Sequence, residues 1–106
     1  MTLDWNEHPA ARAEYLDALA RYAGIEDGDL GEEFANEAEA ATDLILEWPD
    51  APPPYRGRRR EPLVRTWHLG KFPYNLVYAV REGEIFILAY AHESRRPGYW
   101  THRLND

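Results

Sequence analysis

Apolar residues recur every three or four positions in two stretches of the first half of the chain, which is the spacing of one face of an α-helix. The first stretch consists of Ala11, Tyr15, Ala18, Leu19 and Tyr22. It follows Pro9, a residue favoured in the first turn of a helix, and precedes Gly24, which we expect to end the helix in the left-handed conformation. The second stretch consists of Leu30, Phe34, Ala38, Ala41, Ile45 and Trp48.

The second stretch also carries helix start and stop signals. Asp29 and Glu32 have the spacing of a reciprocal N-terminal cap, and Pro49 cannot continue a helix. Only the short segment around IEDGD separates the two stretches. The pattern therefore predicts two antiparallel helices whose apolar stripe must be covered by a sheet or by another helix.

The pattern changes in the second half to short runs rich in β-branched and aromatic residues. DAPPPYRGRRRE predicts a loop, because its prolines hold the chain extended and Gly57 breaks any periodicity. PLVRTWHL, PYNLVYAV and EIFILAYAH then predict three consecutive antiparallel strands, with a tight turn at Glu82 and Gly83. The alternation around Leu3 and Trp5 allows one further strand at the start of the chain.

These elements predict an α+β fold, with a helical hairpin packed on a three- to four-stranded antiparallel sheet. We expect a short C-terminal helix that Pro97 opens and that runs through Tyr99 and Trp100. The 106 residues suffice for one domain, residues 1–106, with a core that needs no disulfide or metal, and the chain has no cysteine. No segment has the pattern of a signal peptide or a membrane span, so we expect a cytoplasmic protein.

Charge is distributed unevenly along the chain, whose net charge is -7. Residues 1–50 hold 14 acidic side chains and two arginines, whereas residues 51–106 hold ten basic and five acidic side chains. The overall charge argues against nucleic acid as a partner, but the asymmetry indicates that the two halves face different partners. The basic half includes Arg56, Arg58, Arg59, Arg60 and Arg65. Guanidinium groups suit phosphate and carboxylate recognition, although these arginines could equally form surface ion pairs with the acidic helices.

The stretch AHESRRPGYWTHR, residues 91–103, gathers cations, rings and histidines directly after an apolar strand. Arg95 and Arg96 suit an anionic or protein target, and we expect one ring of the Tyr99–Trp100 pair to anchor the terminal helix to the sheet. His92 follows Phe86, Leu88 and Tyr90 at period two and so is predicted to share their sheet face, as a buried histidine or as an acid or base. The four histidines lack HxH or HxxxH spacing, so we predict no metal site and no cofactor.

Five segments, taken in order, resemble the ParE-like branch of the RelE/ParE superfamily of bacterial toxins. They are HPAARAEYLDALARY, LGEEFANEAEAATDLI, WPDAPPPYRGRRR, KFPYNLVYAV and IFILAYAHESRRPGYWTHR. The resemblance implies the toxin of a type II toxin–antitoxin pair, associated with growth inhibition and plasmid stabilisation. It also implies a cognate antitoxin whose tail wraps around the helices and the sheet. ParE-like members are associated with poisoning DNA gyrase, whereas RelE-like members cleave messenger RNA in the ribosome.

The RelE-like alternative can be compared residue by residue. That branch carries basic residues on the strand before the central hairpin, an arginine on the next strand, another after the last strand, and a C-terminal tyrosine. Aligned on PYNLVYAV, the first positions fall at Thr66 and His68, and the strand arginine becomes Asn75. Arg95 or Arg96 and Tyr99 match. Because an anionic transition state needs the missing cation, we assign no catalytic residue. If the chain is a nuclease, the candidates are His68, His92, Arg95 and Tyr99.

We therefore predict a toxin that acts by binding, with DNA gyrase as its target and no membrane or small-molecule substrate. The predicted target-binding residues are Arg56, Arg58, Arg59, Arg60, Arg65, Arg95, Arg96, Tyr99 and Trp100. The predicted antitoxin-binding residues are Tyr15, Leu19, Tyr22, Phe34, Glu37 and Ala41. The alternatives are a ribosome-dependent mRNA endonuclease, and a non-toxic relative that only binds its antitoxin.

Overall fold

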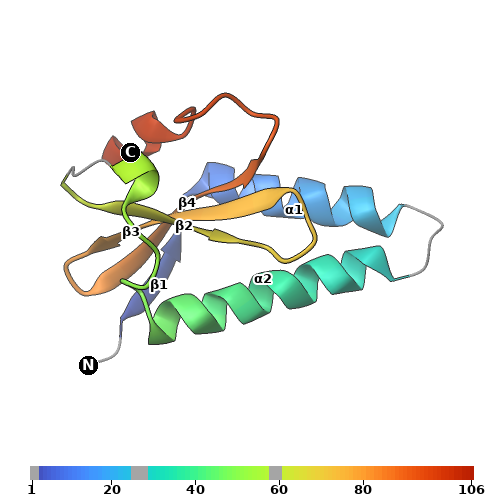
Figure 1. Cartoon of the computed structure of the whole chain (residues 1–106). Coiled ribbons are helices and arrows are strands. Elements are labelled where there is room, and N and C mark those ends of the chain that lie inside the picture. The colour runs from blue at the N-terminus through green and yellow to red at the C-terminus, as the bar shows by residue number, and fades with distance from the viewer. Residues whose placement is uncertain (1–2, 25–28, 58–60) are drawn as a thin grey trace.

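The computed structural model describes residues 3–24, 29–57 and 61–106, and confirms the two predicted helices, α1 (Pro9–Ala23) and α2 (Leu30–Glu47) (Figure 1). Pro9 occupies the first turn of α1, as predicted. The left-handed end predicted at Gly24 is wrong: its φ is -82°, because its amide still bonds to the Ala20 carbonyl at 3.1 Å. The cap predicted for α2 is also wrong. The Asp29 side chain makes no cap hydrogen bond, and α2 starts instead with a backbone bond from Glu33 to Asp29.

The sheet has the order β1-β4-β3-β2. Its strands are β1 (Asp4–Glu7), β2 (Val64–His68), β3 (Tyr74–Arg81) and β4 (Glu84–His92). β2, β3 and β4 form the predicted antiparallel meander, and Gly83 takes the positive φ of 73° at the predicted tight turn. β1 is present as the fourth strand, but it pairs with β4 in parallel and so makes the sheet mixed. The helical hairpin between β1 and β2 carries the chain across one face of the sheet before the meander begins (Figure 1).

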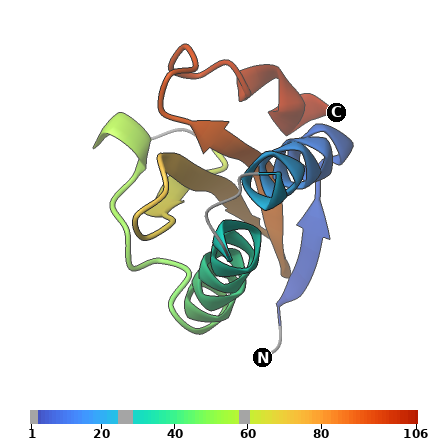
Figure 2. The same ribbon diagram turned by 90° about the vertical axis from the view of Figure 1, so that its right-hand side faces the viewer.

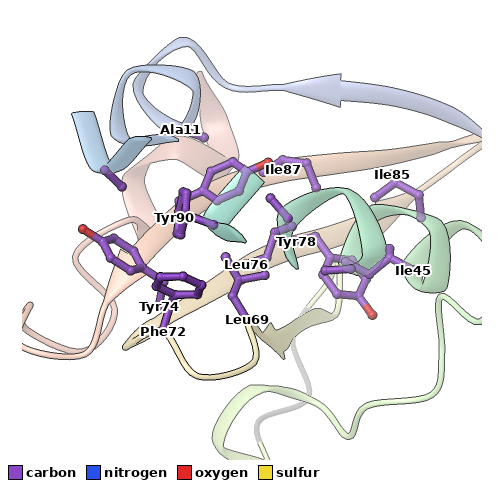
Figure 3. Close-up of a cluster of buried hydrophobic side chains, with 14 residues drawn as sticks. Ala11, Ile45, Leu69, Phe72, Tyr74, Leu76, Tyr78, Ile85, Ile87 and Tyr90 are labelled. Atoms are coloured by element: carbon purple, nitrogen blue, oxygen red, sulfur yellow. The ribbon is translucent and has the colours of Figure 1, made fainter. Parts of the chain in front are cut away.

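Each face of the sheet has its own hydrophobic cluster. The helices cover one face, where Ile45 of α2 lies in one cluster with Leu76, Tyr78 and other strand residues (Figure 3). Phe34 of α2 belongs to the same cluster. The residues after β4 cover the opposite face together with the single-turn 3-10 helix η1 (Tyr55–Gly57) (Figure 2). Trp48, predicted for the buried stripe, lies beyond the end of α2 and is 58% exposed.

The segment after β4 is less helical than predicted. Residues 97–100 form turns, and a 3-10 helix, η2 (Thr101–Asn105), begins only after Tyr99 and Trp100. Trp100 is nevertheless the anchor of this segment, because its side chain is buried in the cluster against Val77 and Leu88. The predicted anchoring role is thus confirmed for one ring of the pair, while the predicted helix starts later.

A β-bulge in β4 changes which side chains share a face. Val77 pairs with Ala89 but Tyr78 pairs with Ile87, which leaves Leu88 as the extra residue. Leu88 therefore faces the C-terminal segment, whereas Tyr90 faces the helices. The prediction that His92 shares a face with Phe86, Leu88 and Tyr90 is wrong for the first two, because strict alternation fails at the bulge. The His92 ring instead meets the ring of Tyr74, with centroids 5.0 Å apart.

The difference in burial between Phe34 and Leu16 leads to a prediction about stability. Phe34 is fully buried between α2 and the sheet, whereas Leu16 on α1 is 52% exposed. We expect Phe34→Ala to lower the free energy of unfolding by about 3 to 5 kcal/mol, the usual cost of truncating a buried aromatic. Leu16→Ala should change it by less than about 1 kcal/mol. Urea denaturation followed by circular dichroism measures both, and equal losses would contradict the assignment of Phe34 to the core.

Candidate functional site

A groove of about 290 Å³ lies on the sheet face opposite the helices, between the strands and the segment that follows β4. We call it the C-terminal groove. Thr66 and Asn75 come from the sheet, and Arg56 comes from η1. The other lining residues include His92, Glu93, Arg95, Arg96, Tyr99 and Trp100. The fold thus brings the arginine pair, one histidine and one loop arginine to a single concavity.

The segment that lines the groove is held in place by a carboxylate on α1. Glu14 accepts hydrogen bonds from the Tyr99 hydroxyl at 2.7 Å and from both terminal nitrogens of Arg103 at 3.0 and 3.1 Å. Its Oε1 also accepts from the backbone amide of Tyr90 at 3.1 Å. Arg103 is 6% exposed, and its Nη1 donates in addition to the Leu88 carbonyl at 2.9 Å. A largely buried ion pair therefore joins α1, β4 and η2.

A second contact ties the end of the chain to the start of α1. His8 accepts from the Ala10 amide through Nδ1 at 3.0 Å, so its Nε2 carries the proton that is donated to Asp106 at 2.8 Å. This bond keeps η2 beside the junction of β1 and α1. The segment after β4 is thus held to α1 through Tyr99 and Arg103, and to His8 through Asp106.

Within the groove, Arg95 stacks on the ring of Tyr99, with its guanidinium carbon 3.9 Å from the ring centroid. The Arg95 side chain is 52% exposed, and one of its nitrogens lies 3.9 Å from Glu14. Burial and the hydrogen bond to Glu14 both raise the pKa of Tyr99 above its usual value of about 10. Tyr99 is therefore neutral at physiological pH, and its hydroxyl proton is committed to Glu14.

Not all predicted target-binding residues line the groove. Arg65 donates to the Pro52 carbonyl and lies 3.8 Å from Asp50, with a side chain only 12% exposed. It holds the loop before η1 against β2, and its assignment to the target surface stays a prediction. Trp100 lines the groove but is 2% exposed and packs edge-on against Tyr55 at 5.1 Å, which makes it structural. Arg58, Arg59 and Arg60 lie outside the described residues.

The two candidate histidines occupy different positions. His92 borders the groove, and its Nδ1 accepts a hydrogen bond from the Ser94 amide at 3.0 Å. His68 is exposed on β2, outside the groove lining, and contacts Asn75 through Nδ1 at 3.1 Å. Asn75 does line the groove, in the position where the RelE-like branch carries an arginine. The arrangement holds cations and hydrogen-bond donors suited to an anionic surface.

The predicted antitoxin-binding residues divide into two groups. Tyr15, Leu19 and Tyr22 are partly exposed along α1, and the half-buried Glu37 lies on α2 beside Gly70. The other two, Phe34 and Ala41, are 0% and 3% exposed within the core. Neither side chain is exposed to a partner in this structure, because both are buried in the core that α2 forms with the sheet and α1.

Glu14 and Arg103 were not predicted from the sequence. Glu14 lies three residues after Ala11 and four before Ala18, both of which are buried, so it is an acidic residue within the apolar stripe of α1. That spacing was available as a signal, because a carboxylate on a buried helix face needs a partner. Nothing comparable in the sequence singles out Arg103 among the other arginines.

The observed architecture is a helical hairpin on one face of a four-stranded mixed sheet, with a cationic groove on the opposite face. No family model and no curated protein matches this sequence. A solved structure described as the chromosomal ParDE TA system from P. aeruginosa contains a chain with a similar fold. The TM-score is 0.68 at 15% sequence identity, and the match covers 86% of this chain and 96% of that chain. At this identity the likeness establishes the fold.

Two further observations concern the described residues alone. Neither α1 nor α2 combines the length and apolar composition needed to cross a bilayer. Residues 3–24, 29–57 and 61–106 bring no three His, Asp or Glu side chains together as a group that could hold a metal ion.

The buried ion pair predicts a large effect of a nearly isosteric change. Glu14→Gln keeps the side-chain shape but removes the charge opposite Arg103, which is left buried and unpaired. We expect this variant to lose about 3 kcal/mol of stability, as is typical when one partner of a buried pair is removed. Asp17→Asn, on the exposed side of the same helix, is the control and should change stability by less than about 0.5 kcal/mol. Thermal unfolding of both variants measures this, and a Glu14→Gln variant as stable as Asp17→Asn would contradict the role given to Glu14.

Proposed function

We propose that this chain is the toxin of a type II toxin–antitoxin pair, that it acts by binding rather than by cleaving a bond, and that DNA gyrase is its target. The likeness to a chain of the ParDE system supports the toxin part of this proposal, because it extends over nearly the whole length of both chains. The ordered resemblance of the sequence to the ParE-like branch supports it independently. The acting surface is the C-terminal groove, with Arg56, Arg95 and Arg96 as its exposed cations.

The chemistry of the groove supports binding over catalysis. A general acid or base needs a titratable group near neutral pH and in reach of the reacting atoms. The Tyr99 hydroxyl is engaged by Glu14, and its pKa is raised. Asn75 cannot supply the positive charge that the RelE-like reaction would require at that position. Exposed guanidiniums, by contrast, suit paired recognition of carboxylates or phosphates on a target surface.

One observation keeps the RelE-like alternative as a second candidate. His92, Arg95 and Tyr99 line the same groove, as three of the four residues proposed for a nuclease. In a nuclease, His92 would have to exchange protons while Arg95 stabilises the developing negative charge. The third reading, a non-toxic relative that only binds its antitoxin, shares the same fold and predicts normal growth.

The target proposal is tested with purified protein. We expect the chain to inhibit DNA supercoiling by gyrase and to leave ribosome-bound messenger RNA intact, because the groove exposes arginines but carries Asn75 where the RelE-like reaction would need a cation. A supercoiling assay and primer extension on translating ribosomes give the two readouts. Cleavage of messenger RNA that His92→Ala abolishes would establish the nuclease instead, and inactivity in both assays with normal growth on induction would support the non-toxic reading.

The arginine pair tests the acting surface. We expect the double variant Arg95→Ala with Arg96→Ala to abolish growth inhibition and to change stability by less than about 1 kcal/mol, since both side chains are exposed. Lys71→Ala, an exposed cation at the β2–β3 turn, is the control and should remain toxic. Colony counts after induction, at equal expression, measure the effect. Full toxicity in the double variant would show that these arginines are ordinary surface charge.

A further inference from the structure

A second hollow, of about 260 Å³, lies beside the C-terminal groove but on the α1 side of the sheet. We call it the α1-side hollow. It is lined by Glu14, Asp17, Ala18, Arg21, Tyr74, Tyr90, His92, Ser94 and Arg95. His92 and Arg95 also line the C-terminal groove, so these two residues form a wall that both concavities share.

Neither cation of this hollow has a carboxylate within hydrogen-bond distance among the described residues. Arg21 donates to the neutral Tyr74 hydroxyl at 3.2 Å and forms no ion pair with the part of the chain that the structure describes, Asp17 included. Arg95 lies 3.9 Å from Glu14, too far for a hydrogen bond. Glu14 already receives four hydrogen bonds, from Tyr90, Tyr99 and Arg103. The carboxylates of Glu14 and Asp17 also line the hollow, but Arg21 pairs with neither of them and Arg95 has only the long contact with Glu14.

Two neutral donors complete the lining. His92 accepts from Ser94 through Nδ1, so in the neutral ring Nε2 carries the proton. The Tyr74 hydroxyl accepts from Arg21 and can donate its own proton. A carboxylate, which has two acceptor oxygens and a negative charge, suits this combination of cations and neutral donors.

We propose that the α1-side hollow binds an acidic side chain of the antitoxin, and that this contact draws Arg95 out of the C-terminal groove. The inference rests on the proposed function, because it takes the antitoxin as the partner. The hollow opens beside α1, the helix that carries the partly exposed Tyr15, Leu19 and Tyr22. A carboxylate between Arg21 and Arg95 competes with the target for Arg95, so an antitoxin on the helices neutralises a groove on the opposite face without covering it.

Substitution of Arg21 can separate neutralisation by the antitoxin from toxicity, because Arg21 lines the α1-side hollow and not the C-terminal groove. We expect Arg21→Gln to remain toxic and to bind the antitoxin, which is to be sought as a small protein encoded beside this chain, at least tenfold more weakly. Cells that make both proteins should then stop growing with Arg21→Gln and grow normally with the parent chain. Lys71→Gln, which removes one exposed charge away from both concavities, should stay within twofold of the parent in affinity. Isothermal titration calorimetry and co-expression growth curves give the two readouts.

The outcomes distinguish this inference from the proposed function. If the parent chain neither inhibits growth nor binds the neighbouring protein, the proposed function fails and takes the inference with it. If the parent binds but Arg21→Gln binds equally well, the inference alone is overturned. Arg21→Lys keeps the charge and provides a second test, with an intermediate affinity expected, should Arg21→Gln prove unstable. If Arg21→Gln weakens binding of inorganic phosphate to the free chain and leaves antitoxin affinity unchanged, the hollow serves a free anion and the proposal is overturned.

Discussion

Beyond the end of β1, strand β4 has backbone groups with no strand to pair with them. β1 stops at Glu7, opposite Ile87, and the bulge follows immediately at Leu88. Buried amide and carbonyl groups must be paired, because leaving one unsatisfied costs free energy comparable to a lost hydrogen bond. Here Arg103 donates to the Leu88 carbonyl and Glu14 accepts from the Tyr90 amide. The buried Glu14–Arg103 ion pair therefore makes hydrogen bonds to β4 that a longer β1 would otherwise make.

The positions of several distant segments follow from that substitution. Arg103 must lie under α1 to meet both Glu14 and β4, which fixes η2 against the sheet. Tyr99 donates to the same carboxylate, so its ring is held where Arg95 can stack on it. The C-terminal groove is thus shaped by α1 as much as by the strands that form its floor. Arginine has two roles here. Arg103 satisfies a backbone carbonyl of β4, whereas Arg95 remains exposed to a partner.

Simple patterns predicted most of the fold because one face of each helix is buried and the strands are runs of β-branched and aromatic residues. The three meander strands were recovered for that reason, together with the turn at Gly83. The parallel pairing of β1 depends on where the helical hairpin crosses the sheet, which no local pattern contains. The bulge at Leu88 escaped prediction for a similar reason, because EIFILAYAH is apolar on both faces. A strand buried on both sides carries no alternation that could reveal a register shift.

The sequence indicated which residue types form the candidate site, but not which individual arginines belong to it. The sequence gathers arginines into two runs, and Arg95 and Arg96 do line a groove with Arg56. It cannot separate them from Arg65 and Arg103, because a guanidinium that satisfies a carbonyl is the same residue type as one that faces solvent. The distinction depends on burial and on nearby acceptors, which only the tertiary structure supplies.

The two faces of the molecule differ in charge in a way that sorts partners. The exposed side of α2 carries only acidic charge, from Glu32, Glu33, Glu39, Asp43 and Glu47, whereas the C-terminal groove exposes arginines. An anionic target is repelled by α2 and attracted by the groove, while a basic segment experiences the reverse. Glu14 and Arg95 lie where these two surfaces meet. Glu14 is on α1, which packs against β4, and Arg95 is in the segment that follows β4. A partner bound on the helix side can therefore affect the groove electrostatically, because Arg95, which lines the groove, lies 3.9 Å from Glu14 on α1.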